Sequence, residues 1–137
     1  MVPFLESAGW TLKDHVESDG WSGACFAEDR LLVTFANEVR VEQGNASAQW
    51  CAKWLAQRPC EVVFDTRALE GYPSQMRAAW QEHVWSQRHQ ILRVALVSTH
   101  SLHRMGVAMF GLALSVPTST STSPEGYLQT TQAHPLT

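Results

Sequence analysis

The chain has 137 residues, of which 45% are hydrophobic and 17% are charged. This is the length of one domain and the composition of a protein with an apolar core, so global disorder is excluded. Ten Lys and Arg residues against thirteen Asp and Glu residues give a formal net charge of −3. That sign is wrong for a protein built around nucleic-acid phosphates, so we expect a single domain over 1–137 and no nucleic-acid partner.

Three further features indicate where such a protein works. No segment stays apolar for the roughly 20 residues of a membrane-spanning helix, so we expect no membrane span. The first residues lack the basic start and long apolar stretch of a secretory signal. Cys25, Cys51 and Cys60 form no CxxC pair and cannot all be bridged with one another, which favours a reduced, cytoplasmic protein.

The first part of the chain has the pattern of an antiparallel β-meander. Its β-forming segments are 10–16, 23–27 and 31–36. Asp19-Gly20, between the first two, is a strong signal for a two-residue hairpin turn. We expect this meander to make an N-terminal β extension over 1–30 that precedes a core over 31–130.

A helix is predicted next, because the apolar period changes from two to 3.6 residues after Gly44. It covers 46–57, with Asn45 as its N-cap. Its apolar stripe is Trp50, Cys51, Trp54 and Leu55. We expect the two tryptophans to cover one edge of a sheet rather than to form a ligand platform.

The rest of the chain alternates strands with helices. The predicted elements are strands over 60–65 and 91–98, and helices over 74–89, 102–114 and from Pro124 onward. The segment 66–73 is predicted to be a polar connection, and 131–137 a flexible tail. This order indicates an α/β fold with a mixed sheet of four to five strands and helices mainly on one face.

The outer faces of helices 74–89 and 102–114 carry residues that are typical of a contact surface. Trp85 projects from the polar side of helix 74–89, where a large aromatic ring favours a covering partner. The predicted inner stripe of helix 102–114 is Leu102, Met105, Gly106, Met109, Phe110 and Ala113. Its outer side then carries Arg104, Val107, Ala108 and Gly111, mostly small residues that allow close approach. These positions are explained equally well by an interface with a partner or by the N-terminal strands or the last helix of the same chain packing over them.

From about Leu31 to Gln129 the order of elements resembles a STAS domain, the anti-sigma-factor antagonist fold with its SpoIIAA-like variants in bacteria. The matching segments are the strands 31–35, 62–65 and 94–97, the helix opening at Ser74 and the helix opening at 101–106. In that family the loop before the second helix often carries an Asp-Ser-Ser/Ala-Gly type motif whose serine a partner kinase phosphorylates.

Ser74 lies at the corresponding place and is the candidate phosphoacceptor that the resemblance implies. The chain departs from the motif, because Tyr72 or Pro73 stands where the motif has Asp and the following Gly is absent. A serine at a helix start is explained more simply as a cap, worth about 0.5–2 kcal/mol. We therefore expect Ser74 to cap its helix.

Catalytic and metal-binding signals are weak. A triad of Asp65, Ser74 and His100 could be drawn, but the sequence holds no G-x-S-x-G elbow. His100 and His103 have i, i+3 spacing without a further ligand beside them, and His83 is simply explained as a hydrogen-bonded residue at the core edge. We expect no catalytic site, no metal and no cofactor.

These observations favour a non-enzymatic bacterial regulatory module that binds another protein or a second copy of itself. The expected partner-binding residues are Arg67, Glu70, Tyr72, Ser74, Trp85, Arg104, Val107 and Gly111. The alternative is a carrier or sensor of small apolar ligands, with a pocket lined by Trp50, Trp54, Met105 and Met109. A hydrolase using Asp65, Ser74 and a histidine is the third interpretation.

Overall fold

The strands of the sheet follow the order of the chain, each pairing with the next one in sequence. The computed structural model describes residues 9–133. The six strands are β1 (Leu12–Ser18), β2 (Trp21–Phe26), β3 (Arg30–Glu38), β4 (Cys60–Gly71), β5 (Ile91–Val97) and β6 (Thr118–Ser121). β1, β2 and β3 pair antiparallel, whereas β3 to β6 pair in parallel, so the sheet is mixed as expected.

The meander belongs to this same sheet, since β3 joins it to the parallel half. Gly20 forms its first turn with a φ of +80°, a conformation that glycine adopts without strain. The prediction of four to five strands is too low. β6 reads Thr-Ser-Thr-Ser and has no apolar period, so only its backbone pairing with β5 identifies it as a strand.

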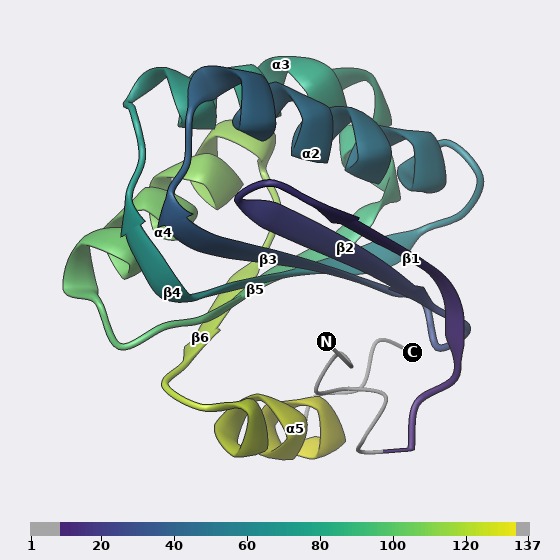
Figure 1. Ribbon diagram of the computed structural model, residues 1–137. Helices are drawn as coiled ribbons and strands as arrows, with labels where there is room; N and C mark the ends of the chain where they lie inside the picture. Colours follow the sequence, from purple (N-terminus) through teal and green to yellow (C-terminus); the bar gives the residue numbers. More distant parts are fainter. Residues whose placement is uncertain (1–8, 134–137) are drawn as a thin grey trace.

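Helices cover both faces of the sheet unequally (Figure 1). α2 (Val41–Leu55), α3 (Gln75–Val84) and α4 (Ser101–Leu114) pack on one face, and α5 (Pro124–Ala133) lies on the other. A short 3₁₀ helix over Trp85–Gln90 leads from α3 into β5. Helices mainly on one face are therefore confirmed, with α5 as the exception.

Side chains of β2, β3, β4 and β5 enter two separate cores, one on each face of the sheet. Leu31, Val33 and Phe35 of β3 point toward α2, α3 and α4, where the larger core lies. Leu32 points to the opposite face and packs with Tyr127 of α5 in the smaller core. The smaller core also contains Ala24, Phe26, Val63, Ala95 and Val97.

The boundaries of the first two helices differ from the prediction. α2 begins at Val41, four residues before the predicted cap, and the Arg40 N–H donates to Oε1 of Gln43 at 2.8 Å. Gly44 lies inside the helix, where Met76 packs against it: a Cβ there would lie 2.7 Å from Met76 Cγ. α3 ends at Val84, so the last five residues of the predicted helix 74–89 are 3₁₀.

The predicted polar connection 66–73 is mostly strand. β4 continues to Gly71 because β3 continues beside it, with Glu38 opposite Gly71. Thr66 and Leu69 are buried in this extension. Backbone pairing thus overrides the polar composition.

The face of α4 is reversed relative to the prediction. Leu102, Met105, Met109 and Ala113 are exposed, and of the predicted inner stripe only Phe110 is buried. Gly111 and Leu114 are buried with Phe110, and Val107 packs against the larger core. Apolar residues occur on both sides of this helix, so its sequence does not identify the inner side.

Two expectations for α2 and α3 are confirmed. Trp50 covers β2, where a Cβ at Gly23 would lie 2.8 Å from the indole ring. His83 is held at the core edge by a hydrogen bond of 3.0 Å between its Nε2 and Asn45 Oδ1.

Two of the expected segments lie at the ends of the chain. Residues 1–8 of the expected N-terminal extension and 134–137 of the expected tail are outside the described residues, whereas 131–133 belong to α5. None of the helices found over 9–133 is long and apolar enough to cross a bilayer.

Candidate functional site

An apolar pocket opens between α3 and α4, above the C-terminal parts of β3, β4 and β5. Its volume is about 70 Å³. The apolar side chains lining it are Phe35, Phe64, Leu69, Met76, Trp80, Leu96, Val107 and Phe110. Open α/β sheets hold ligands at the carboxyl ends of their parallel strands, and this pocket lies there.

Trp80 is the centre of the pocket wall. Its ring meets Phe64 edge to face with the centroids 4.9 Å apart, and it meets Phe35 and Phe110 edge to face as well, at 6.5 and 6.3 Å. The indole N–H donates to Ser47 Oγ at 3.2 Å, and Ser47 in turn donates to the Gly44 carbonyl at 2.8 Å. The wall is therefore fixed by hydrogen bonds as well as by packing.

His103 supplies a polar group at the mouth of the pocket. Its Nδ1 lies 2.9 Å from Thr66 Oγ1 and 3.0 Å from Ser98 Oγ. Burial, and to a lesser extent the neighbouring His100, lowers the pKa of His103 below its ordinary 6.5. The neutral imidazole is favoured there, and with its proton on Nε2 the ring can accept a hydrogen bond at Nδ1 from either hydroxyl.

Tyr72 stands at the rim of the same pocket and is 36% exposed. Its ring centroid is 6.2 Å from that of His103. Gly106 on α4 leaves room for the phenol, because a Cβ at Gly106 would lie 3.0 Å from Tyr72 Oη. An exposed aromatic ring is thus placed beside an apolar cavity.

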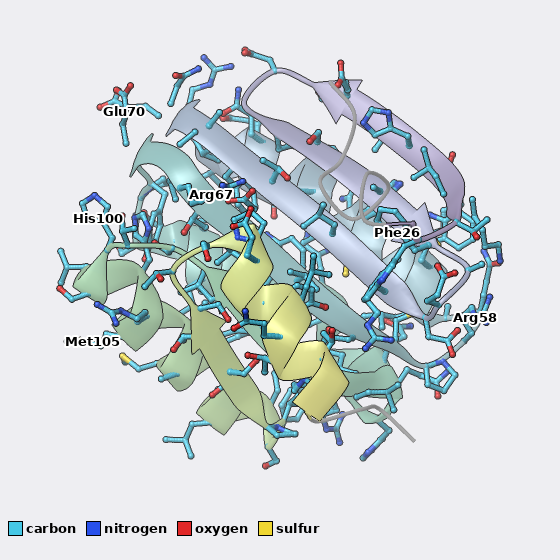
Figure 2. All side chains as sticks on the ribbon, turned by 90° about the horizontal axis from the view of Figure 1, so that it is seen from below. Phe26, Arg58, Arg67, Glu70, His100 and Met105 are labelled. Atoms are coloured by element: carbon cyan, nitrogen blue, oxygen red, sulfur yellow. The ribbon has the colours of Figure 1, made fainter. Side chains whose placement is uncertain are left out.

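The structure separates several of the predicted partner-binding residues. Arg67, Glu70, Tyr72, Ser74, Trp85 and Arg104 are exposed as expected. Arg67 lies near Glu125 in the first turn of α5, whereas Glu70 lies at the outer margin of the molecule (Figure 2). Only some of these residues therefore border the pocket mouth.

Trp85 lies at the far end of α3 from Ser74. It is 50% exposed, and the Arg88 guanidinium lies 4.0 Å from its ring centroid. Arg88 also donates to the Trp85 carbonyl at 2.8 Å. Trp85 therefore forms a separate aromatic surface rather than part of the pocket rim.

The predicted exposure of Val107 and Gly111 is wrong. Val107 lines the pocket, and Gly111 is buried where α4 meets β6. A Cβ at Gly111 would lie 2.2 Å from Thr118 Cγ2, so the small residue serves packing inside the chain.

Ser74 does not cap α3, contrary to expectation. It has helical φ and ψ of −58° and −28°, and its hydroxyl makes no capping hydrogen bond. The side chain is exposed at the start of α3. Its hydroxyl is therefore not engaged in holding the helix end.

The prediction that Trp50, Trp54, Met105 and Met109 line an apolar pocket is also wrong. Met105 and Met109 are exposed, and Trp50 and Trp54 pack as part of the covering of the larger core. The cavity lies between α3 and α4 instead, because the aromatic side chains of both helices and of the sheet converge there.

The hydrolytic triad is not assembled. Both oxygens of Asp65 accept hydrogen bonds from the Arg67 guanidinium, at 2.9 and 2.8 Å. The histidine that meets hydroxyls is His103 rather than His100. Within residues 9–133, no three His, Cys, Asp or Glu side chains converge in a way that could hold a metal ion.

Sequence reasoning missed a buried charge network on the other face of the sheet. Glu61 of β4 is fully buried between Arg30 of β3 and Arg93 of β5, which lie opposite it in the strand register. Both arginines bond its carboxylate, and Tyr127 of α5 donates to it as well. A lone Glu in an apolar strand, with an Arg near the start of each neighbouring strand, was the available signal.

Comparison with known proteins adds information on the fold. No family model matches the chain, and no curated protein matches its sequence. One similar structure is that of an uncharacterized DUF3478-family protein with a SpoIIAA-like fold from Shewanella loihica. Its TM-score is 0.61 at 12% identity, over 88% of this chain and 93% of that chain.

Two anti-sigma factor antagonists are also similar. SpoIIAA in its unphosphorylated form gives a TM-score of 0.52 at 13% identity, over 82% of this chain and 97% of that chain. An anti-sigma factor antagonist from Mycobacterium paratuberculosis gives 0.50 at 16% identity, over 89% and 93%. At such identities the likeness concerns architecture, and it confirms the resemblance drawn from the sequence: the chain has the SpoIIAA-like fold of STAS domains.

Proposed function

We propose that this chain is a non-enzymatic bacterial regulatory module that binds another protein through the surface around Tyr72. The observation that carries the proposal is the exposed Tyr72 ring at the rim of an apolar pocket. Exposed aromatic residues beside small pockets are the usual energetic anchors of protein interfaces. Two structural neighbours are described as anti-sigma factor antagonists, which supports a regulatory role.

The size of the pocket favours a protein side chain as its occupant. Sites for small-molecule ligands usually measure about 300–1,000 Å³. This pocket holds about 70 Å³, which is room for one apolar side chain. A partner that inserts such a side chain next to Tyr72 would bury both groups together.

Ser74 adds a regulatory element to the proposal. Its exposed hydroxyl makes no capping bond and lies two residues from Tyr72. Phosphorylation there would add a near-dianion to the surface that binds the partner and change its affinity by charge. Glu70 and Arg104 are the exposed charged residues that we assign to the edge of this surface.

The test is site-specific photocrosslinking in the host bacterium, with a benzophenone amino acid at position 72, at position 85 or at position 49. Gln49 is exposed on α2, away from the pocket, and serves as the control. We expect a defined protein adduct from position 72 and none from position 49. Equal adducts from both, or none from position 72, would contradict the proposal.

The affinity of the crosslinked partner provides the second measurement. Tyr72→Ala is expected to weaken binding by about tenfold or more, as for an interface anchor. Tyr72→Phe keeps the ring and should retain most of the affinity. If Trp85→Ala weakens binding instead, the interface lies at the far end of α3.

A small apolar ligand is the second candidate, because the cavity walls are almost entirely hydrocarbon and aromatic. Native mass spectrometry of protein purified from its own cells should then show a bound mass. Val107→Trp places a larger side chain in the pocket and should remove that mass. A spectrum of the free protein alone would contradict the ligand hypothesis and leave the partner hypothesis standing.

A further inference from the structure

The outer face of α4 carries four large apolar side chains in the open. Leu102, Met105, Met109 and Leu112 are 69%, 59%, 47% and 82% exposed. Their spacing of three, four and three residues is that of a helix-pairing seam, which places all four on one side of the helix. Soluble proteins seldom leave such a stripe uncovered.

The stripe is the same when read in either direction. Its order is Leu, Met, Met, Leu, and its spacing is symmetric about position 107. If a second α4 lies antiparallel to the first, Leu102 of one copy meets Leu112 of the other, and Met105 meets Met109. A two-fold contact needs a surface that is complementary to itself, and this stripe fulfils that condition.

We infer that α4 is a self-association surface, on which two copies of this chain pair their α4 helices antiparallel across a two-fold axis. The inference rests on the exposed stripe alone and is independent of the partner proposed at Tyr72. The occupant is a second copy because the symmetry of the stripe has no use in binding an unrelated partner.

Charges favour the antiparallel arrangement over the parallel one. Arg104 is the one charged side chain of α4, apart from its histidine. Antiparallel pairing about position 107 separates the two Arg104 residues by about 9 Å along the helix axes, whereas parallel pairing puts them at the same level. The helix dipoles also oppose each other favourably when antiparallel.

Small residues beside the stripe permit close packing. Ala108 and Ala113 are exposed on either side of it. They allow the axes to approach to about 8–10 Å, the usual separation of packed helices. One helix per copy buries less than the roughly 800 Å² per partner of a standard interface, so we expect a dimer that depends on concentration.

The first test is sedimentation equilibrium over a concentration series. The wild-type chain should move from its 15.3 kDa monomer mass to twice that mass as concentration rises. Met105→Glu should weaken the dimer at least about tenfold, since it places a charge in the apolar seam. Leu92→Glu, which changes an exposed leucine on β5, is the control and should leave association unchanged.

The second test fixes the register by cysteine crosslinking. A mixture of Leu102→Cys and Leu112→Cys chains should form a disulfide-linked dimer on oxidation, because these positions face each other. Either variant alone should not, since its two cysteines lie about 15 Å apart along the axes, beyond disulfide reach. The native cysteines are buried and do not interfere.

Three results would overturn the inference. They are a monomer at every concentration, a dimer that Met105→Glu leaves intact, and crosslinking of Leu102→Cys alone as fast as the mixture. Thermal unfolding of each variant checks that the fold is retained, so that loss of association is not loss of structure.

Discussion

Tyr127 on α5 donates its phenolic hydrogen to the carboxylate of Glu61 on β4 and so ties the helix of the second face to the middle of the sheet. Arg30 and Arg93 bond the same carboxylate from the neighbouring strands. Burial, with the nearby Glu61 charge, raises the pKa of Tyr127, so the phenol stays protonated and remains a donor. Four groups thus form one buried network.

Removing Glu61 should destabilise the protein strongly. Glu61→Ala leaves two arginines without their buried counter-charge, and we expect a loss of about 3–5 kcal/mol in the free energy of unfolding. Tyr127→Phe removes one donor and should cost about 1–3 kcal/mol. Urea denaturation followed by circular dichroism measures both. Glu70→Ala, at an exposed carboxylate, is the control, and a similar loss there would contradict the prediction.

The order of the elements could be predicted because their apolar periods are clear. β3 and β5 are mostly apolar and rich in β-forming residues, and α2 carries one apolar stripe ending at Leu55. β6 could not be predicted in the same way, since its Thr and Ser residues are held by pairing with β5 alone. Backbone hydrogen bonds leave no pattern in the side chains.

The candidate site could not be predicted, because it depends on contacts between elements that the apolar period of a single helix or strand does not show. α4 has large apolar residues on both sides, such as the buried Phe110 and the exposed Leu112. Which side of the helix faces the core is therefore decided by the elements that it packs against. Gly111 fits against Thr118, a contact between two elements that the helix sequence does not reveal. Both the pocket and the exposed stripe follow from that orientation.

Two serines should respond differently to truncation. Ser74→Ala removes an exposed hydroxyl that caps nothing, so the free energy of unfolding should change by less than about 0.5 kcal/mol. Ser47→Ala removes the buried partner of the Trp80 indole and should cost about 1–3 kcal/mol. Thermal unfolding of the two variants compares them directly. A larger loss for Ser74→Ala would show that it stabilises the helix start.

The three cysteines should be inert in the folded protein. Burial raises the pKa of Cys60 to about 12 from its ordinary 9.0 and also raises the pKa of Cys25 and Cys51. At pH 8 the thiolate fraction of Cys60 falls about a thousandfold. Iodoacetamide should therefore label the native chain slowly and all three thiols quickly in denaturant. Fast labelling of any one thiol in the native state would contradict this.

Acidification should destabilise the pocket mouth through His103. Because burial lowers its pKa in the folded state, the unfolded chain binds the proton more readily. The stability that neutral His103 contributes is complete above pH 6.5 and is lost as the pH falls through the lower folded value. Imidazole NMR should give a pKa below 6.5, and His103→Gln should flatten the decline in unfolding free energy between pH 7 and pH 5. A variant that keeps the wild-type slope would place the titration at another group.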